Sequence, residues 1–198
     1  MGKNIKMLKC FFKVMLNNKE ETKKIIPQMY VKNIYEIDYG YLKKNKLTNL
    51  IFDIDNTLLP TDDKQVPDKL KKMFKNLEQQ NFTICIMSNN KEERVKPVAI
   101  ALNTSYLYKS DKPNKEAFDK ALNLLQSKKE NTVMIGDQMM SDIKGANDYG
   151  IYSILTDPLT SINNLKTKTS RILQNIMEKH LKKKNLFIKK QYYTKEEK

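Results

Sequence analysis

Short apolar runs alternate along the chain with segments in which apolar residues recur every three or four positions. The runs are typical of buried strands, and the spaced pattern is typical of amphipathic helices. The strands expected on this basis are 50–54, 83–87, 106–108, 132–135 and 151–155. The helices expected are 30–37, 67–80, 91–102, 115–126 and 142–148. This alternation favours an α/β fold whose mostly parallel sheet is covered by helices on both faces.

The segment 3–16 has a different pattern, with lysines on one arc of a helical wheel and apolar residues over the rest. The lysines are Lys3, Lys6, Lys9 and Lys13. Such a helix suits an anionic membrane interface, and it equally suits packing against the chain's own domain or a second subunit. A secretory signal is not indicated, because lysines interrupt the apolar stretch and no small-residue cleavage site follows. Periodicity alone does not decide between the membrane, the domain and a second subunit.

The 198 residues carry a net charge of +14, which is concentrated at the two ends. Residues 1–46 have a net charge of +7 and residues 163–198 of +8, whereas the segment between them is at −1. The chain therefore has a nearly neutral middle between two basic ends. Basic ends attract polyanions such as an anionic membrane, RNA or a phosphorylated substrate, although lysines in a tail can also serve only solubility.

The composition argues against several kinds of site. Two cysteines do not make a disulfide scaffold or a four-thiolate zinc site, and a single histidine argues against a histidine-based triad. No apolar run reaches the roughly 20 residues of a membrane-spanning helix. We therefore expect a cytoplasmic protein, with peripheral contact at the inner face of the membrane as an option. Its chemistry would come from carboxylates, lysines and hydroxyls.

Polar side chains follow three of the expected strands, and a lysine lies between the second and third groups. The carboxyl ends of parallel strands meet at one edge of a sheet, which is where ligands bind in such folds. We expect the polar groups to converge at that edge. They are Asp53, Asp55 and Thr57, then Ser88 and Asn89, then Lys112, and finally Asp137 with Asp142.

Two of these carboxylates, Asp53 and Asp55, lie two positions apart where strand becomes loop. One can attack a phosphorus atom while the other donates a proton to the leaving oxygen and later takes one from water. Asp137 adds a carboxylate for a hard cation such as Mg²⁺. Ser88 and Lys112 would hold the phosphoryl oxygens through hydrogen bonds and positive charge. The set predicts a magnesium-dependent site for phosphoryl transfer.

Each of these residues also has a purely structural interpretation. An aspartate before a turn commonly caps the turn or the following helix, which applies most to Asp142. Lys109 and Lys115 compete with Lys112 as the partner of the phosphate, although neither precedes a proline. Cys85 lies in an apolar run and is interpreted as a core residue rather than a nucleophile.

The order and spacing of the polar groups resemble the four motifs of the haloacid dehalogenase (HAD) superfamily of phosphatases. The matching residues are Asp53-x-Asp55-x-Thr57, Ser88, Lys112 and Gly136-Asp137-x-x-x-x-Asp142. Finer features resemble the YqeG-like group of subfamily IIIA, which is similar to mitochondrial phosphatidylglycerophosphate phosphatases. They include Ser88-Asn89-Asn90 followed by Arg94, and Lys112-Pro113 followed by Ala117-Phe118. The resemblance covers about residues 25–180 and implies a HAD-like, Rossmannoid three-layer sandwich over that segment. A basic amphipathic extension at 1–24 and a lysine-rich tail at 181–198 would lie outside this domain.

The resemblance also implies a role for each residue. Asp53 would be the nucleophile that forms an aspartyl-phosphate, and Asp55 would be the general acid and base. Mg²⁺ would be held by Asp53, Asp137 and the backbone carbonyl of Asp55. The phosphate would be bound by Thr57, Ser88, Asn89 and Lys112. Asp142 would lie outside the metal ligands and orient a bound water or Lys112.

The gaps between the motifs leave no room for the cap domain that some HAD enzymes carry. About 30 residues separate Asp55 from Ser88, and about 20 separate Asn90 from Lys112. A single strand-and-helix unit fills each gap. An uncapped site is open, which suits a phosphate on a lipid headgroup, a nucleic-acid end or a protein, or a site closed by a second subunit of an oligomer.

We therefore expect a Mg²⁺-dependent phosphomonoesterase, with phosphatidylglycerophosphate at an anionic membrane as the substrate that the basic ends favour. A phosphatase of a soluble or nucleic-acid phosphate is the alternative among enzymes. A catalytically idle RNA- or ribosome-associated protein on the same fold is the alternative outside them. The intact set of carboxylates argues against the idle protein.

Overall fold

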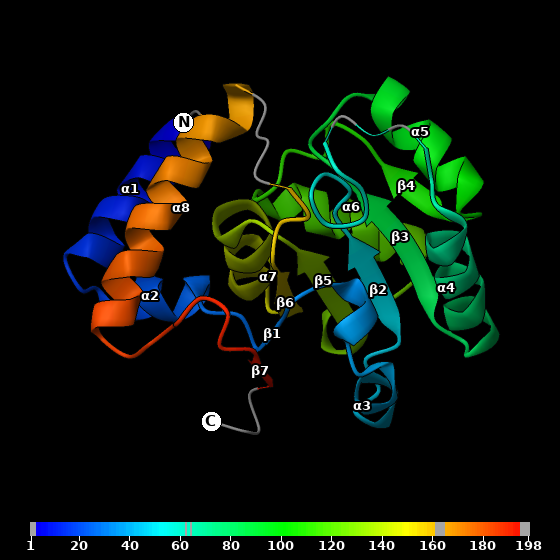
Figure 1. Cartoon of the computed structure of the whole chain (residues 1–198), viewed down its shortest axis with the longest axis horizontal. Helices are drawn as coiled ribbons and strands as arrows, with labels where there is room; N and C mark the ends of the chain where they lie inside the picture. The colour runs from blue at the N-terminus through cyan, green and yellow to red at the C-terminus, as the bar shows by residue number, and fades with distance from the viewer. Residues whose placement is uncertain (1–2, 62, 64, 161–164, 195–198) are drawn as a thin grey trace.

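A computed structural model describes the chain except for residues 1–2, 62, 64, 161–164 and 195–198 and the side chains of 3–6 and 165–170. Seven strands form one sheet in the order β4-β3-β2-β5-β6-β1-β7 (Figure 1). They are β1 (Met29–Val31), β2 (Asn49–Phe52), β3 (Thr83–Met87), β4 (Ser105–Leu107), β5 (Thr132–Gly136), β6 (Tyr152–Thr156) and β7 (Tyr193–Thr194). Neighbouring strands pair in parallel except β7, which is antiparallel to β1. The expected α/β fold with a mostly parallel sheet is confirmed.

Helices lie around this sheet (Figure 1). They are α1 (Lys3–Met15), α2 (Lys19–Ile25), α3 (Tyr39–Lys44), α4 (Asp68–Gln79), α5 (Glu92–Ala101), α6 (Lys115–Leu125), α7 (Lys144–Tyr149) and α8 (Leu165–Lys183). Short 3₁₀ turns occur at Ile34–Glu36 and Lys129–Asn131, and a π-helical turn at Met139–Ile143 leads into α7. The segment between β2 and β3 contains α4 and a loop, and the segment between β3 and Lys112 contains α5 and β4.

The central strands bury both of their faces, because successive side chains of a strand point to opposite sides. Leu50 and Phe52 of β2 pack in one apolar cluster with Phe74 of α4. Ile51, between them, packs in a second cluster with Phe118 of α6. These two clusters are the layers above and below the sheet. They hold β2, β3 and β5 side by side, so that the residues after these strands meet at one edge.

The helix predicted over 30–37 is wrong. Residues 29–31 form strand β1, which pairs in parallel with β6, and only Ile34–Glu36 is helical, as a 3₁₀ turn. Asn33 begins this turn by accepting a hydrogen bond from Tyr35 N–H at 2.9 Å. The strand depends on a partner more than 120 positions away, at Ile154 and its neighbours. Local periodicity does not report such a partner.

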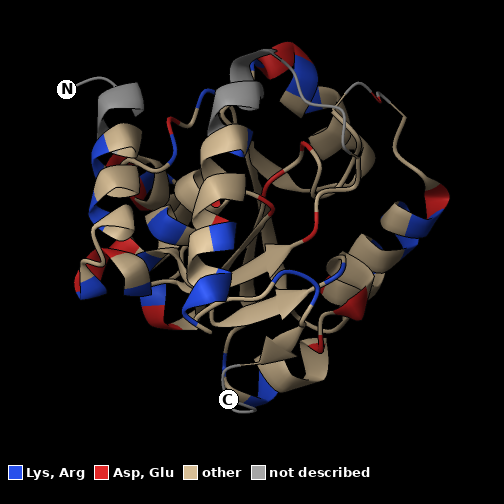
Figure 2. Cartoon of the chain, turned by 60° about the vertical axis from the view of Figure 1, so that its left-hand side comes forward, with Lys and Arg blue, Asp and Glu red and all other residues tan. Residues whose placement is uncertain are grey.

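The two ends of the chain pack together against the body. Cys10 and Val14 of α1 are buried in a third apolar cluster with Met177 and Leu181 of α8. Figures 1 and 2 show α1 and α8 side by side. Packing on the chain's own domain, one of the three possibilities for the N-terminal segment, therefore accounts for one face of α1. The described chain after residue 180 also packs on the body, through the buried Phe187 and through β7.

No helix in the described part of the chain is both long enough and apolar enough to cross a membrane. Lysines occur along both α1 and α8 (Figure 2), and Lys9, Lys13, Lys179, Lys182 and Lys183 are exposed.

Candidate active site

Lys112 is a buried cation that joins two of the predicted aspartates. Its Nζ lies 2.8 Å from Asp53 Oδ1 and 2.9 Å from Asp142 Oδ1, and only 1% of the residue is exposed. Asp53 directly follows β2 and Asp142 lies in the π turn after β5, so two neighbouring parallel strands bring both carboxylates to one edge. Lys109 and Lys115 are exposed. Of the three candidate lysines, Lys112 is therefore the one inside the site.

Burial and neighbouring charges set the protonation of this cluster. The pKa of Asp53 is raised to about 7, mainly by burial and also by the charges of Asp142 and Asp55, while Lys112 acts to lower it. Burial opposes the charge on Lys112, but the carboxylates of Asp142 and Asp53 more than offset this and raise the pKa of the ammonium. Lys112 therefore keeps its proton and stabilises Asp53 as an anion.

Asp142 is fixed by several hydrogen bonds besides its ion pair with Lys112. Its Oδ2 accepts from Gln138 N–H at 3.0 Å, and its Oδ1 accepts from the Ser141 hydroxyl at 3.3 Å. These contacts connect Asp142 to the residues that follow β5 and to Lys112. They are not the hydrogen bonds of a residue that caps the following helix.

The carboxylate of Asp137 is fully buried and bound on one side only. Arg171 of α8 binds its Oδ2 through Nη2 and donates from Nη1 to its backbone carbonyl at 3.0 Å. Oδ1 has no hydrogen-bond partner among the described residues. Leaving a buried carboxylate oxygen unpaired costs free energy, so such an oxygen indicates a ligand.

The acidic groups at this edge fit a divalent metal ion. Asp53, Asp137 and Asp142 each offer an oxygen, and these three oxygens lie within 4.8 Å of one another. Hard cations such as Mg²⁺ prefer oxygen ligands of this kind. One of the three residues is Asp137, whose Oδ1 lacks a hydrogen-bond partner among the described residues. Asp142, expected to lie outside the ligands, is a member of the cluster.

Asp55 is bound by two side chains that follow β3. Its carboxylate accepts from Arg94 Nε at 3.0 Å and from Asn90 Nδ2 at 3.1 Å. The other nitrogens of Arg94 donate to the backbone carbonyls of Pro60, at 3.0 Å, and of Asp63. Arg94 therefore fixes both Asp55 and the loop that follows it.

Sequence reasoning assigned no role to either arginine. The chain has two arginines among 37 basic residues, and each of them binds an aspartate of this site. A planar guanidinium can hold a carboxylate and a second acceptor in fixed geometry, which an ammonium group does not do. The rarity of arginine in a lysine-rich chain is the signal that could have identified Arg94 and Arg171.

Asn89 positions the loop of Lys112. Its Oδ1 accepts from Lys112 N–H at 2.7 Å and from the Ser110 hydroxyl at 2.9 Å, and its Nδ2 donates to the Lys112 carbonyl at 3.0 Å. Both ends of the amide are engaged in this way, and the contact of Asn89 with phosphate stays a prediction.

Ser88 and Thr57, the two hydroxyl residues predicted to bind phosphate, lie after the neighbouring strands β3 and β2. Ser88 directly follows β3, and its Oγ accepts from Asn90 N–H at 3.1 Å. Thr57 is buried, and its Oγ1 has no hydrogen-bond partner in the described part of the chain. Thr57 is therefore one of the groups whose hydrogen bonding is incomplete without a ligand.

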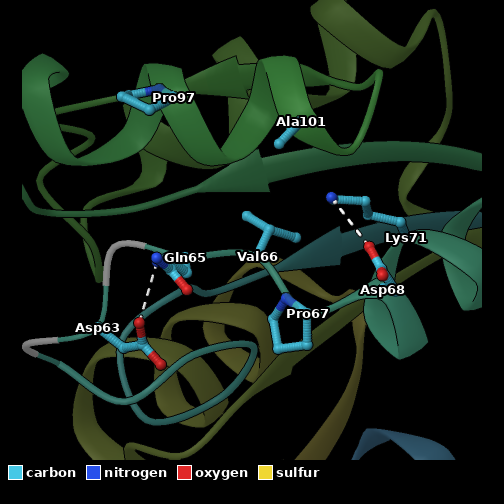
Figure 3. A pocket seen from close by; sticks show the side chains of 8 residues that line it. All are labelled: Asp63, Gln65, Val66, Pro67, Asp68, Lys71, Pro97 and Ala101. Carbon is cyan, nitrogen blue, oxygen red and sulfur yellow. Dashed lines mark hydrogen bonds and ion pairs between the residues drawn. The ribbon is translucent and has the colours of Figure 1, made fainter.

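An open groove of about 550 Å³ lies beside the site, between the segment after Asp63 and α5 (Figure 3). Its lining residues are Asp63, Gln65, Val66, Pro67, Asp68, Lys71, Pro97 and Ala101. Arg94 reaches the carbonyl of Asp63 at one end of this groove. The groove contains none of the three clustered aspartates, so it adjoins the site without being its centre.

Comparison with known proteins gives the class to which this site belongs. A family model described as HAD-hydrolase-like matches residues 110–158, which include Lys112 and the Gly136–Asp142 motif. The chain is also 34% identical over 159 residues to "Probable phosphatase YqeG" of Bacillus subtilis (strain 168). The match covers 80% of this chain and 92% of that protein. The chain thus belongs to the YqeG-like phosphatases of the HAD superfamily and is a hydrolase.

Solved structures of similar fold include an uncharacterised protein from Listeria monocytogenes serotype 4b, at 23% identity and a TM-score of 0.44. The match covers 65% of this chain and 99% of that one. A second is the cobalt-bound deoxy-D-mannose-octulosonate 8-phosphate phosphatase YrbI of Haemophilus influenzae, at 13% identity and a TM-score of 0.46. That match covers 70% of this chain and 94% of the other.

Proposed function

We propose that the chain is a Mg²⁺-dependent phosphomonoesterase that works through an aspartyl-phosphate on Asp53. The pairing of buried Asp53 with Lys112 at 2.8 Å is the observation that supports this most, because the cation favours the anionic form that a nucleophile needs. An oxygen of Asp53 would attack phosphorus as the bond from phosphorus to the ester oxygen breaks. Water would then displace phosphate from Asp53 and restore the carboxylate.

Asp55 would move the protons of both steps. It would donate one to the leaving oxygen and take one from the water that attacks the aspartyl-phosphate. The hydrogen bonds from Arg94 and Asn90 orient its carboxylate for this exchange. Ser88, Thr57 and Lys112 would hold the phosphoryl oxygens.

Mg²⁺ would be held by Asp53, Asp137 and the backbone carbonyl of Asp55, with Asp142 beside them. When bound, the ion would offset negative charge on the carboxylates and the phosphoryl group. The clustered oxygens support this assignment, as does Asp137 Oδ1, which has no hydrogen-bond partner in the part of the chain that the structure describes.

Release of inorganic phosphate from a generic aryl phosphate tests the proposal. We expect activity that requires Mg²⁺, is abolished by a chelator and falls by several orders of magnitude in Asp53→Asn. Asp68→Asn, which removes an exposed carboxylate on α4, is the matched control and should retain full activity. An Asp53→Asn variant as active as the wild type would overturn the nucleophile assignment.

We further propose that the physiological substrate is phosphatidylglycerophosphate in an anionic membrane. α1 exposes Leu8 and Phe12, the exposed Leu16 follows directly after the helix at the same spacing of four residues, and Lys9 and Lys13 are also exposed. An apolar stripe beside lysines is suited to the surface of an anionic bilayer. The neighbouring α8 adds exposed Ile172 and Ile176.

The test uses vesicles of anionic lipid that contain phosphatidylglycerophosphate, compared with neutral vesicles and with soluble and nucleic-acid phosphates. We expect binding to anionic vesicles and Mg²⁺-dependent phosphate release from them, both reduced by Phe12→Ser. Hydrolysis of soluble or nucleic-acid phosphates alone would discard the lipid and keep the phosphatase. Binding of RNA without any hydrolysis would favour the idle binding protein.

A further inference from the structure

We propose that α8 positions the metal ligand Asp137, through Arg171 and Gln174, and so forms part of the active site. The inference rests on the metal site proposed above. It concerns two side chains that lie outside the four motifs and outside the region that the family model matches.

Arg171 holds Asp137 at two points. One nitrogen binds carboxylate Oδ2 and another donates to the backbone carbonyl of the same residue at 3.0 Å. Because Arg171 contacts both the carboxylate and the backbone carbonyl of Asp137, rotation of the Asp137 side chain is restricted. Oδ1 has no hydrogen-bond partner among the described residues, and Asp137 offers a carboxylate oxygen to the cluster with Asp53 and Asp142.

Gln174, one helical turn further along α8, holds the next part of the same loop. Its Oε1 accepts from Met139 N–H at 3.1 Å, and its Nε2 donates to Glu178 Oε1 at 3.0 Å. Glu178 is in turn paired with Lys189 at 3.2 Å. Arg171, Gln174 and Glu178 are all buried, so one polar face of α8 packs directly on the segment that carries the metal ligand.

This arrangement indicates that Arg171 orients the side chain of Asp137 and does not only compensate its negative charge. Every other basic residue described on α8, apart from His180, is a lysine, and a lysine would supply the same positive charge. A lysine ammonium would not hold the carboxylate and the carbonyl of Asp137 in one fixed geometry. Hydrogen-bond partners that orient a metal ligand typically contribute about 10- to 100-fold to metal affinity.

Two variants separate orientation from charge. Arg171→Lys keeps the positive charge but loses the simultaneous contacts with the carboxylate and the backbone carbonyl of Asp137. Gln174→Met keeps a neutral side chain of similar size but loses the acceptor for Met139 N–H. Lys179→Arg, an exposed exchange on the same helix, is the control. The probe is Mn²⁺, titrated into the full chain without substrate and followed by electron paramagnetic resonance, with the metal-free melting temperature measured for each variant.

We expect about a tenfold or greater increase in the Mn²⁺ dissociation constant for Arg171→Lys and a several-fold increase for Gln174→Met. The control should bind as the wild type does. A merely structural role would lower the metal-free melting temperature and leave the affinity of the folded fraction unchanged. Wild-type affinity in the folded variants would overturn the inference, and if one variant fails to fold the other decides. Absence of Mn²⁺ binding in the wild type would overturn the proposed metal site itself.

Discussion

Gly136 and the side chain of Asp142 lie so close together that no side chain fits between them. A Cβ on residue 136 would lie 2.6 Å from Asp142 Cβ and 2.4 Å from its Oδ2. Strand β5 ends at Gly136, and the π turn that follows folds Asp142 back over the end of the strand. The missing side chain at 136 is what allows Asp142 to reach Lys112.

Gly136→Ala should therefore displace Asp142 and damage the site. We expect a loss of about 1–3 kcal/mol in the free energy of unfolding, typical of overpacking, and a large loss of phosphatase activity. Urea unfolding and aryl phosphate hydrolysis measure the two effects. Gly40→Ala is the control, because Gly40 is exposed and its added Cβ would meet only Asp38 Oδ1, at 3.2 Å. Equal behaviour of the two variants would contradict the proposed role of Gly136.

Lys112→Met should destabilise the protein as well as inactivate it. The substitution leaves the buried carboxylates of Asp53 and Asp142 without their shared cation, and breaking a buried ion pair in this way typically costs about 3–5 kcal/mol. The exposed Lys109→Met should change the free energy of unfolding by less than about 0.5 kcal/mol. Urea titration at neutral pH compares them. A small effect at 112 would mean that the carboxylates are not charged in the folded state.

The stability of the metal-free protein should depend on pH through Asp53. Its pKa is about 7 in the folded chain and near 3.8 in an ordinary setting. Between these values the folded state holds a proton that the unfolded state releases, so this carboxyl makes stability fall as pH rises from about 4 to about 7. Asp53→Asn removes the titration. In the presence of a chelator, the melting temperatures of the wild type and of Asp53→Asn should converge at low pH. They should separate as pH rises, with the variant the more stable protein. Parallel pH profiles would argue against the raised pKa of Asp53.

The two cysteines should be unreactive in the folded chain. Burial raises the pKa of the Cys85 thiol to about 12, and burial likewise raises that of Cys10 to about 12. Only the thiolate reacts with iodoacetamide. Mass spectrometry should show little labelling at pH 8 and complete labelling in urea. Rapid labelling of Cys10 alone would indicate that α1 detaches from α8.

Residues that act locally could be predicted from the sequence. The strands β2, β3 and β5 are continuous apolar runs followed by polar residues, and this arrangement is sufficient to place Asp53, Ser88 and Asp137 at one edge. Of the three candidate lysines, Lys112 is the buried one, and Cys85 is in the core as expected.

Features that depend on distant contacts could not be predicted in the same way. Strand β1 exists because β6 lies beside it, and α8 packs on the Asp137 loop only after the sheet has formed. In the sequence alone, Arg171 is therefore indistinguishable from the other positive charges of the basic C-terminal segment, because only the fold brings it against Asp137. The same holds for Arg94, because its position in the sequence does not predict the 3.0 Å contact between its Nε and Asp55 Oδ1.

Trapping of the covalent intermediate tests the central claim most directly. Asp55→Asn should let Asp53 displace a good aryl leaving group while slowing the attack of water, so that aspartyl-phosphate accumulates. Acid quenching and borohydride reduction would then convert Asp53 to homoserine, which mass spectrometry detects. We predict this conversion at residue 53 only when both Mg²⁺ and substrate are present. Phosphate release by the wild type with no modification at residue 53 of the variant would contradict the account.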